Sequence, residues 1–98
     1  MGKYLVLWEI DQSRVPVDAK ERGVAWGLFL EMVKQHLKSG TAKDWGAFVG
    51  EINGYSIHEG TEVEVGNELV RFAPYVSFKV YPISSVDQIT EVIKSMSG

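Results

Sequence analysis

The dipeptide Asn53-Gly54 restricts the folds open to this chain more than any other short stretch. Both central residues of a type I′ turn need φ > 0, and Asn-Gly adopts this conformation most easily. Apolar and aromatic residues flank the pair throughout residues 45–60, WGAFVGEINGYSIHEG. The sequence therefore predicts a β-hairpin in which Asn53-Gly54 forms a two-residue loop and Ile52 lies opposite Tyr55.

This register assigns the hairpin side chains to two faces, because side chains alternate along a strand. The first face is predicted to lie beneath helices and to carry Phe48, Ile52, Tyr55 and Ile57. The second face mixes a carboxylate and an imidazole with apolar neighbours: Trp45, Ala47, Val49, Glu51, Ser56 and His58. We expect this second face to meet a ligand or a second subunit.

The length of the chain indicates one domain, residues 1–98. Hydrophobic residues make up 45% and charged residues 23%, which argues against disorder. A fold of this size buries only about 60–70% of the surface that its unfolded chain exposes. Three Trp, four Tyr and four Phe are therefore difficult to bury in a monomer, and we expect some at a subunit interface or in a pocket.

Charge and cysteine content disfavour several classes of function. Ten basic and 13 acidic residues give a net charge of −3 without a Lys/Arg cluster, which argues against DNA or RNA as a partner. A chain without cysteine forms no disulfide, thiolate nucleophile or Cys-based metal centre. The first residues lack a signal-peptide h-region and no apolar run reaches membrane-spanning length, so we expect a cytoplasmic protein with no membrane partner.

The segments before the hairpin predict one strand and one helix. Residues 3–10, KYLVLWEI, are typical of a central strand covered on both faces. Asp18 with Glu21 predicts a helix start, and Lys38 before Gly40 predicts its end.

The last strand and helix are also clearly patterned. Residues 75–83 alternate, with Val76, Phe78 and Val80 on one face and Tyr75, Ser77, Lys79 and Tyr81 on the other. A short final helix begins at Ser85, with Gln88 completing its capping box.

Residues 61–72, TEVEVGNELVRF, fit two different structures. Thr61 and Glu64 match a capping box and predict a helix. The alternation Glu-Val-Glu-Val before Gly66-Asn67 predicts a second hairpin equally well. Local physics leaves both alternatives open.

With a helix at residues 61–72, the order is β-α-β-β-α-β plus a terminal helix, the ferredoxin-like arrangement. The hairpin ending in HEGT, the amphipathic stretch after it, and APYVSFKVYPI resemble the second half of small stand-alone proteins of the dimeric α/β-barrel superfamily. The resemblance covers nearly the whole chain in layout and favours the helix. It implies an α+β fold with an antiparallel sheet covered by two helices on one face, and a homodimer whose two sheets pack face to face into a barrel.

Candidate site residues follow from this arrangement. His58, diagonal to Glu51 in the predicted register, is the candidate acid/base, and the two form our catalytic pair. A histidine that is hydrogen-bonded at an interface fits the same pattern. The ligand-binding candidates are predicted to line the barrel or to end the first strand: Trp45, Lys79, Tyr81, Glu9 and Trp8. The spacing of His, Asp and Glu matches no metal motif, so we expect no metal or cofactor.

Three functions remain open at this point. The first is a homodimeric protein that binds a small, partly apolar molecule in the barrel pocket. The second is a cofactor-free enzyme with His58 as acid/base, because the superfamily includes monooxygenases and isomerases. The third is an assembly or regulatory module whose aromatic face is covered by its interface.

Overall fold

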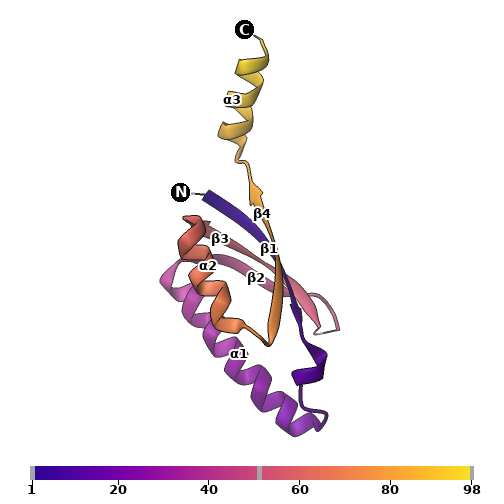
Figure 1. Cartoon of the computed structure of the whole chain (residues 1–98). Helices are drawn as coiled ribbons and strands as arrows, with labels where there is room; N and C mark the ends of the chain where they lie inside the picture. Colours follow the sequence, from indigo (N-terminus) through magenta and orange to yellow (C-terminus); the bar gives the residue numbers. More distant parts are fainter. Residues whose placement is uncertain (1, 51, 98) are drawn as a thin grey trace.

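The computed structural model describes residues 2–50 and 52–97 of the chain. These residues form an α+β fold with a four-stranded antiparallel sheet and three α-helices (Figure 1). The strands are β1 (Gly2–Ile10), β2 (Ala42–Ala47), β3 (Asn53–Gly60) and β4 (Val76–Ile83). The helices are α1 (Ala19–Ser39), α2 (Glu62–Leu69) and α3 (Val86–Met96), with short 3-10 helices η1 (Gln12–Arg14) and η2 (Val70–Phe72).

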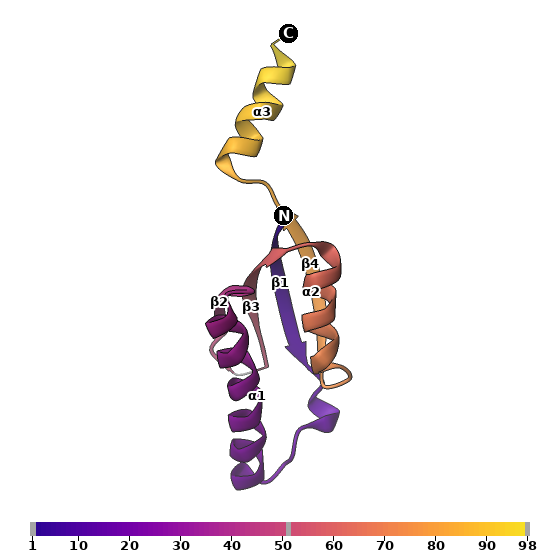
Figure 2. The same ribbon diagram turned by 90° about the vertical axis from the view of Figure 1, so that its left-hand side faces the viewer.

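The strand order is β2-β3-β1-β4, and each neighbouring pair is antiparallel. β1 is central, as its apolar sequence predicts. Figures 1 and 2 show α1 and α2 on the same face of the sheet. We call the opposite face, which no helix of the described chain covers, the open face. The α+β class is confirmed, and the element order through β4 is compatible with a ferredoxin-like fold.

Capping residues determine where the helices begin and end. Asp18 accepts a hydrogen bond from the Glu21 amide at the start of α1, and Gly40 ends this helix at φ 87°. At α2, Thr61 and Glu64 form both hydrogen bonds of a capping box (2.9 and 3.1 Å). The helix at residues 61–72 is therefore confirmed and the hairpin alternative is wrong.

The predicted loop and register of the β2–β3 hairpin are wrong. Asn53 and Gly54 lie within β3, and the chain reverses between Ala47 and Asn53. The Phe48 amide donates to the Asn53 carbonyl (2.8 Å), and Ala47 lies opposite Gly54. Gly54 does not adopt the positive φ that a type I′ turn requires.

Packing between β1 and β3 explains this difference. Gly54 lies opposite Trp8, and a Cβ at residue 54 would overlap with the Trp8 indole and with the carbonyl oxygen of Gly46. Glycine at this position thus permits the close approach of an aromatic ring. This tertiary contact outweighs the local turn preference.

The two faces of the hairpin are exchanged relative to the prediction. Ser56 and His58 share a face as predicted, but this face lies beneath the helices, because Val6, opposite Ser56, packs against α2. The residues predicted to lie under helices are on the open face or in the exposed connection: Phe48, Ile52, Tyr55 and Ile57.

Helix α3 projects from the end of β4, away from the sheet and the other helices (Figure 2). The described chain is elongated as a result, measuring 61 × 24 × 20 Å. The apolar residues of α3 are all exposed: Val86, Ile89, Val92, Ile93 and Met96. None of the described helices combines the length and apolar composition needed to cross a membrane.

We predict that Gly54→Ala lowers the free energy of unfolding by about 1–3 kcal/mol, because the new methyl group overlaps with the Gly46 carbonyl oxygen and with the Trp8 indole. Gly23→Ala is the control, because a Cβ there meets no atom within 4 Å and the helix interior favours alanine. Urea denaturation measures both effects. In a Trp8→Leu background the cost of Gly54→Ala should decrease; an unchanged cost would contradict the packing explanation.

Candidate functional site

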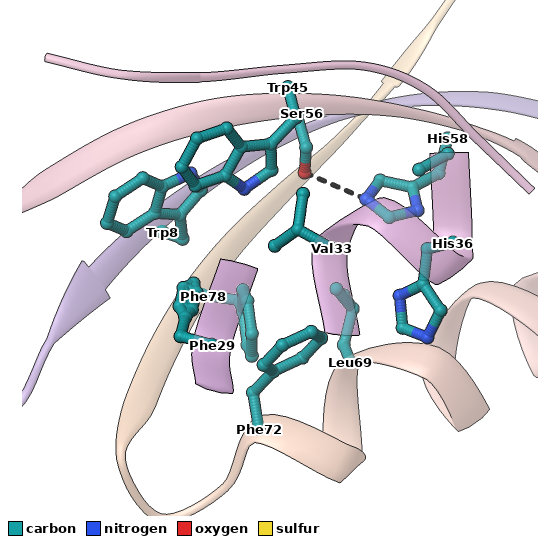
Figure 3. Close-up of a pocket in the computed structure, with 11 residues that line it drawn as sticks. Trp8, Phe29, Val33, His36, Trp45, Ser56, His58, Leu69, Phe72 and Phe78 are labelled. Carbon is teal, nitrogen blue, oxygen red and sulfur yellow. Dashed lines mark hydrogen bonds between the residues drawn. The ribbon is translucent and has the colours of Figure 1, made fainter. Parts of the chain in front are cut away.

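A chain of polar side chains links β3, α2 and α1 beneath the sheet. Figure 3 shows its members Ser56, His58 and His36. Ser56 Oγ lies 2.8 Å from His58 Nε2, and His58 Nδ1 lies 3.2 Å from Glu68 Oε2. The same carboxylate oxygen is 3.8 Å from His36 Nδ1. We call Ser56, His58, Glu68 and His36 the His58 network.

The spacing of these residues in sequence brings them together. Ser56 and His58 are two apart on β3, so they share the helix-covered face. Glu68 follows Val65 by three residues on α2 and so turns toward the same side as this buried valine. His36 stands in the same relation to the buried Val33 on α1. Three elements thus each contribute polar groups to one buried point.

The β3 side of the network is buried, whereas Glu68 and His36 are partly exposed. Ser56 and His58 are each 4% exposed. Within the part of the chain that the structure describes, no buried side-chain nitrogen or oxygen lacks a hydrogen-bond partner. Ser56 and His58 therefore have hydrogen-bond partners for their buried polar atoms, which is the condition for burying them without a large energetic cost.

Burial lowers the pKa of the His58 imidazole below its usual value near 6.5, although the Glu68 carboxylate acts in the opposite direction. A neutral imidazole carries one N–H, and an ionised carboxylate only accepts hydrogen bonds. His58 Nδ1 therefore donates to Glu68, and Nε2 accepts from the Ser56 hydroxyl. This is the hydrogen-bond order of a serine–histidine–carboxylate triad.

The space beside the network is too small for a substrate. The cavity measures about 20 Å³, which is room for roughly one water molecule. Phe29, Phe72 and Phe78 are among the side chains that close it (Figure 3). In this conformation the network stabilises the packing of three elements and does not contact a ligand-sized space.

A larger groove lies at the other end of α1. Its volume is about 450 Å³, and α1, the β1–α1 connection and the η2–β4 segment form its walls. Every described residue that lines it is apolar, aromatic or arginine. Pockets of about 300–1,000 Å³ with mostly apolar linings and a few polar groups are typical of small-molecule sites.

Phe29 and Phe72 line both the groove and the small cavity. Their rings meet edge to face, with centroids 5.4 Å apart. The same Phe72 ring contacts His36 at 5.6 Å. These two phenylalanines therefore form the wall between the groove and the His58 network.

The structure brings together only part of the predicted site. His58, Trp8 and Trp45 lie on the helix-covered face, where the two indoles stack with centroids 5.3 Å apart. Both tryptophans contact Phe29 edge to face and so belong to the aromatic core. Glu51, the predicted partner of His58, lies outside the described residues.

The predicted convergence of Lys79 and Tyr81 with His58 is wrong. Val6 lies opposite both Ser56 and Val80, so Lys79 and Tyr81, the neighbours of Val80, project from the open face. Glu9, next to Trp8, also projects from the open face and is exposed. The three residues are thus separated from His58 by the sheet.

Sequence reasoning missed the partners that the structure assigns to His58. Glu68 had a detectable signal, because it is a carboxylate beside the inward-facing positions Val65 and Leu69 of an amphipathic helix. The arginines of the groove had none, because Arg71 is distant in sequence from Arg14 and Arg22, and no local pattern links the three.

No group of three or more His, Asp or Glu side chains among the described residues is arranged to hold a metal ion. Comparison with protein-family models and with curated proteins finds no match to this chain. Its function is therefore inferred from the geometry of its own residues.

We predict that His58 titrates below pH 6.5 and that Glu68→Gln lowers its pKa further, because the carboxylate that favours the imidazolium is lost. The folded state then binds fewer protons than the unfolded state. The contribution of His58 to stability is therefore full above about pH 6.5 and decreases as the pH falls below it. NMR titration of the imidazole protons measures the pKa, and Glu31→Gln, on the surface of α1, is the control. A His58 pKa at or above 6.5 would contradict the account.

Proposed function

We propose that this protein is a homodimeric binding protein of the dimeric α/β-barrel type, and that each subunit binds a small, partly apolar molecule. The groove of about 450 Å³ carries this proposal. We place the ligand between the helices and the sheet, because His58 and Trp45 lie beneath the helices and do not line a shared barrel.

The floor of the groove supports a ligand with an aromatic or aliphatic body. Trp26 and Phe29 stack with ring centroids 5.2 Å apart, and Phe72 meets Phe29 edge to face. We call these three rings the aromatic floor. Flat, partly exposed rings offer a large contact area with little loss of side-chain entropy.

Unpartnered apolar surface supports the homodimer. An isolated helix of 11 residues is marginal in water, so α3 needs a surface on which to pack. The open face supplies apolar residues of its own, including Leu5, Leu7 and Ile57. A second copy can cover both surfaces, and a stable interface of this kind buries about 1,200–2,000 Å² in total.

A cofactor-free enzyme is the second candidate, because the Ser56–His58–Glu68 hydrogen-bond order suits proton transfer. The Phe29–Phe72 wall separates His58 from the groove. This function therefore requires one of these rings to rotate when substrate binds.

We predict that N-phenyl-1-naphthylamine, a neutral fluorescent probe, binds saturably to the full-length protein. Ala25→Phe places a ring in the groove and should weaken binding about tenfold or more, which corresponds to about 1.4 kcal/mol. Gln35→Phe, at an exposed position of the same helix outside the groove, is the control. Absence of saturable binding, or equal loss in both variants, would contradict the proposed site.

We also predict that light scattering at micromolar concentration gives the mass of two chains. Ile89→Lys places a charge on the apolar side of α3 and should shift the mass toward one chain. Glu91→Gln changes the net charge equally on the polar side of α3 and should leave the dimer intact. A monomeric wild-type protein would exclude the homodimer.

A further inference from the structure

The groove gathers all the arginines of this acidic protein. The sequence contains Arg14, Arg22 and Arg71 and no other arginine, and the three line the same groove. They come from η1, the first turn of α1 and η2, and Figures 1 and 2 show these three segments at the same end of the sheet. Chance would scatter three cations over a protein with a net charge of −3.

The charged side chains that line the groove are all cationic. Among the described residues, none that lines it is Asp or Glu. Arg14 forms an exposed ion pair with Asp11, with Nε 3.3 Å from Oδ2, and Arg22 has an interaction of its own within the chain. Arg71 is exposed at the mouth of the groove. An anion entering here meets cationic groups on an otherwise apolar surface.

The cationic side chains of the groove are all arginines, which indicates the kind of anion that they can bind. A guanidinium group presents a planar set of N–H donors that matches carboxylate, sulfonate and phosphate oxygens, often with two parallel hydrogen bonds. Guanidinium also packs against aromatic rings. Three arginines in the same groove as the aromatic floor therefore complement a molecule with an acidic group at one end and an apolar body at the other.

We propose that the groove binds a small amphipathic anion, with its acidic group among the three arginines and its apolar body against the aromatic floor. This inference rests on the proposed function and names the chemical class of the ligand. The volume of about 450 Å³ suits a small molecule. Helix α3 of a second copy, which carries Asp87 and Glu91, is the competing occupant. A helix with its side chains is about 10–12 Å in diameter, so the volume of the groove favours a small molecule over a helix.

Two probes with the same ring system test the proposal on the full-length protein. 8-Anilinonaphthalene-1-sulfonate carries a sulfonate, and N-phenyl-1-naphthylamine is its neutral counterpart. We expect the sulfonate to bind at least about tenfold more tightly at low salt. Arg71→Gln should reduce this advantage about threefold or more without changing the affinity for the neutral probe. Lys79→Gln removes the same charge from the open face and should change neither affinity.

Three outcomes would overturn the proposal. Equal affinity for the two probes, unchanged by Arg71→Gln, would show that the groove is an apolar site with no preference for anions. Failure of both probes to bind would contradict the proposed binding function as well. Sulfonate affinity that falls as protein concentration rises would show that a second copy, through α3, occupies the groove.

Discussion

The close contact between the Trp8 indole and the backbone at Gly54 determines how the rest of this protein is arranged. It aligns β1 with β3 so that Val6 lies opposite Ser56 and Tyr4 lies opposite His58. Ser56 and His58 are thereby placed beneath the helices. Glu68 of α2 and His36 of α1 then complete the buried polar network, and the Trp8 ring stacks on Trp45 beside it.

The helix-covered side of the sheet thus contains two different environments. One is a largely buried polar network, with a neutral His58 held between Ser56 and Glu68. The other is an open groove with an aromatic floor and guanidinium groups at its edge. Phe29 and Phe72 separate them. A ligand that rotates either ring would open a path between the groove and the His58 network. The same architecture can therefore serve a binding protein or an acid/base enzyme.

Sequence patterns predicted those elements whose signals are local. The caps at Asp18 and Thr61 marked the starts of α1 and α2, and the alternation of residues 76–81 gave the correct faces of β4. The Asn53-Gly54 loop was wrong because Trp8, 46 positions earlier, needs glycine beneath its ring. A turn preference is local, whereas this packing contact depends on how β1 pairs with β3.

The candidate site was predictable only in part, because its contacts also join residues that are distant in the sequence. His58 was singled out correctly as an unusual polar residue, but its carboxylate partner among the described residues is Glu68 on α2, ten positions later. Nothing in the sequence around Arg14, Arg22 or Arg71 indicates that they meet. Their proximity follows from the β1–α1 connection and η2 lying at the same end of the sheet, which requires the complete fold.

The location of the ligand site is the central claim, and NMR shift mapping tests it most directly. The full-length, isotope-labelled protein is titrated with 8-anilinonaphthalene-1-sulfonate. We predict that the largest changes occur at the Trp26 indole N–H and the Arg71 guanidinium, with little change at Lys79 and Tyr81. Changes centred on Lys79 and Tyr81 would place the ligand on the open face and contradict the account.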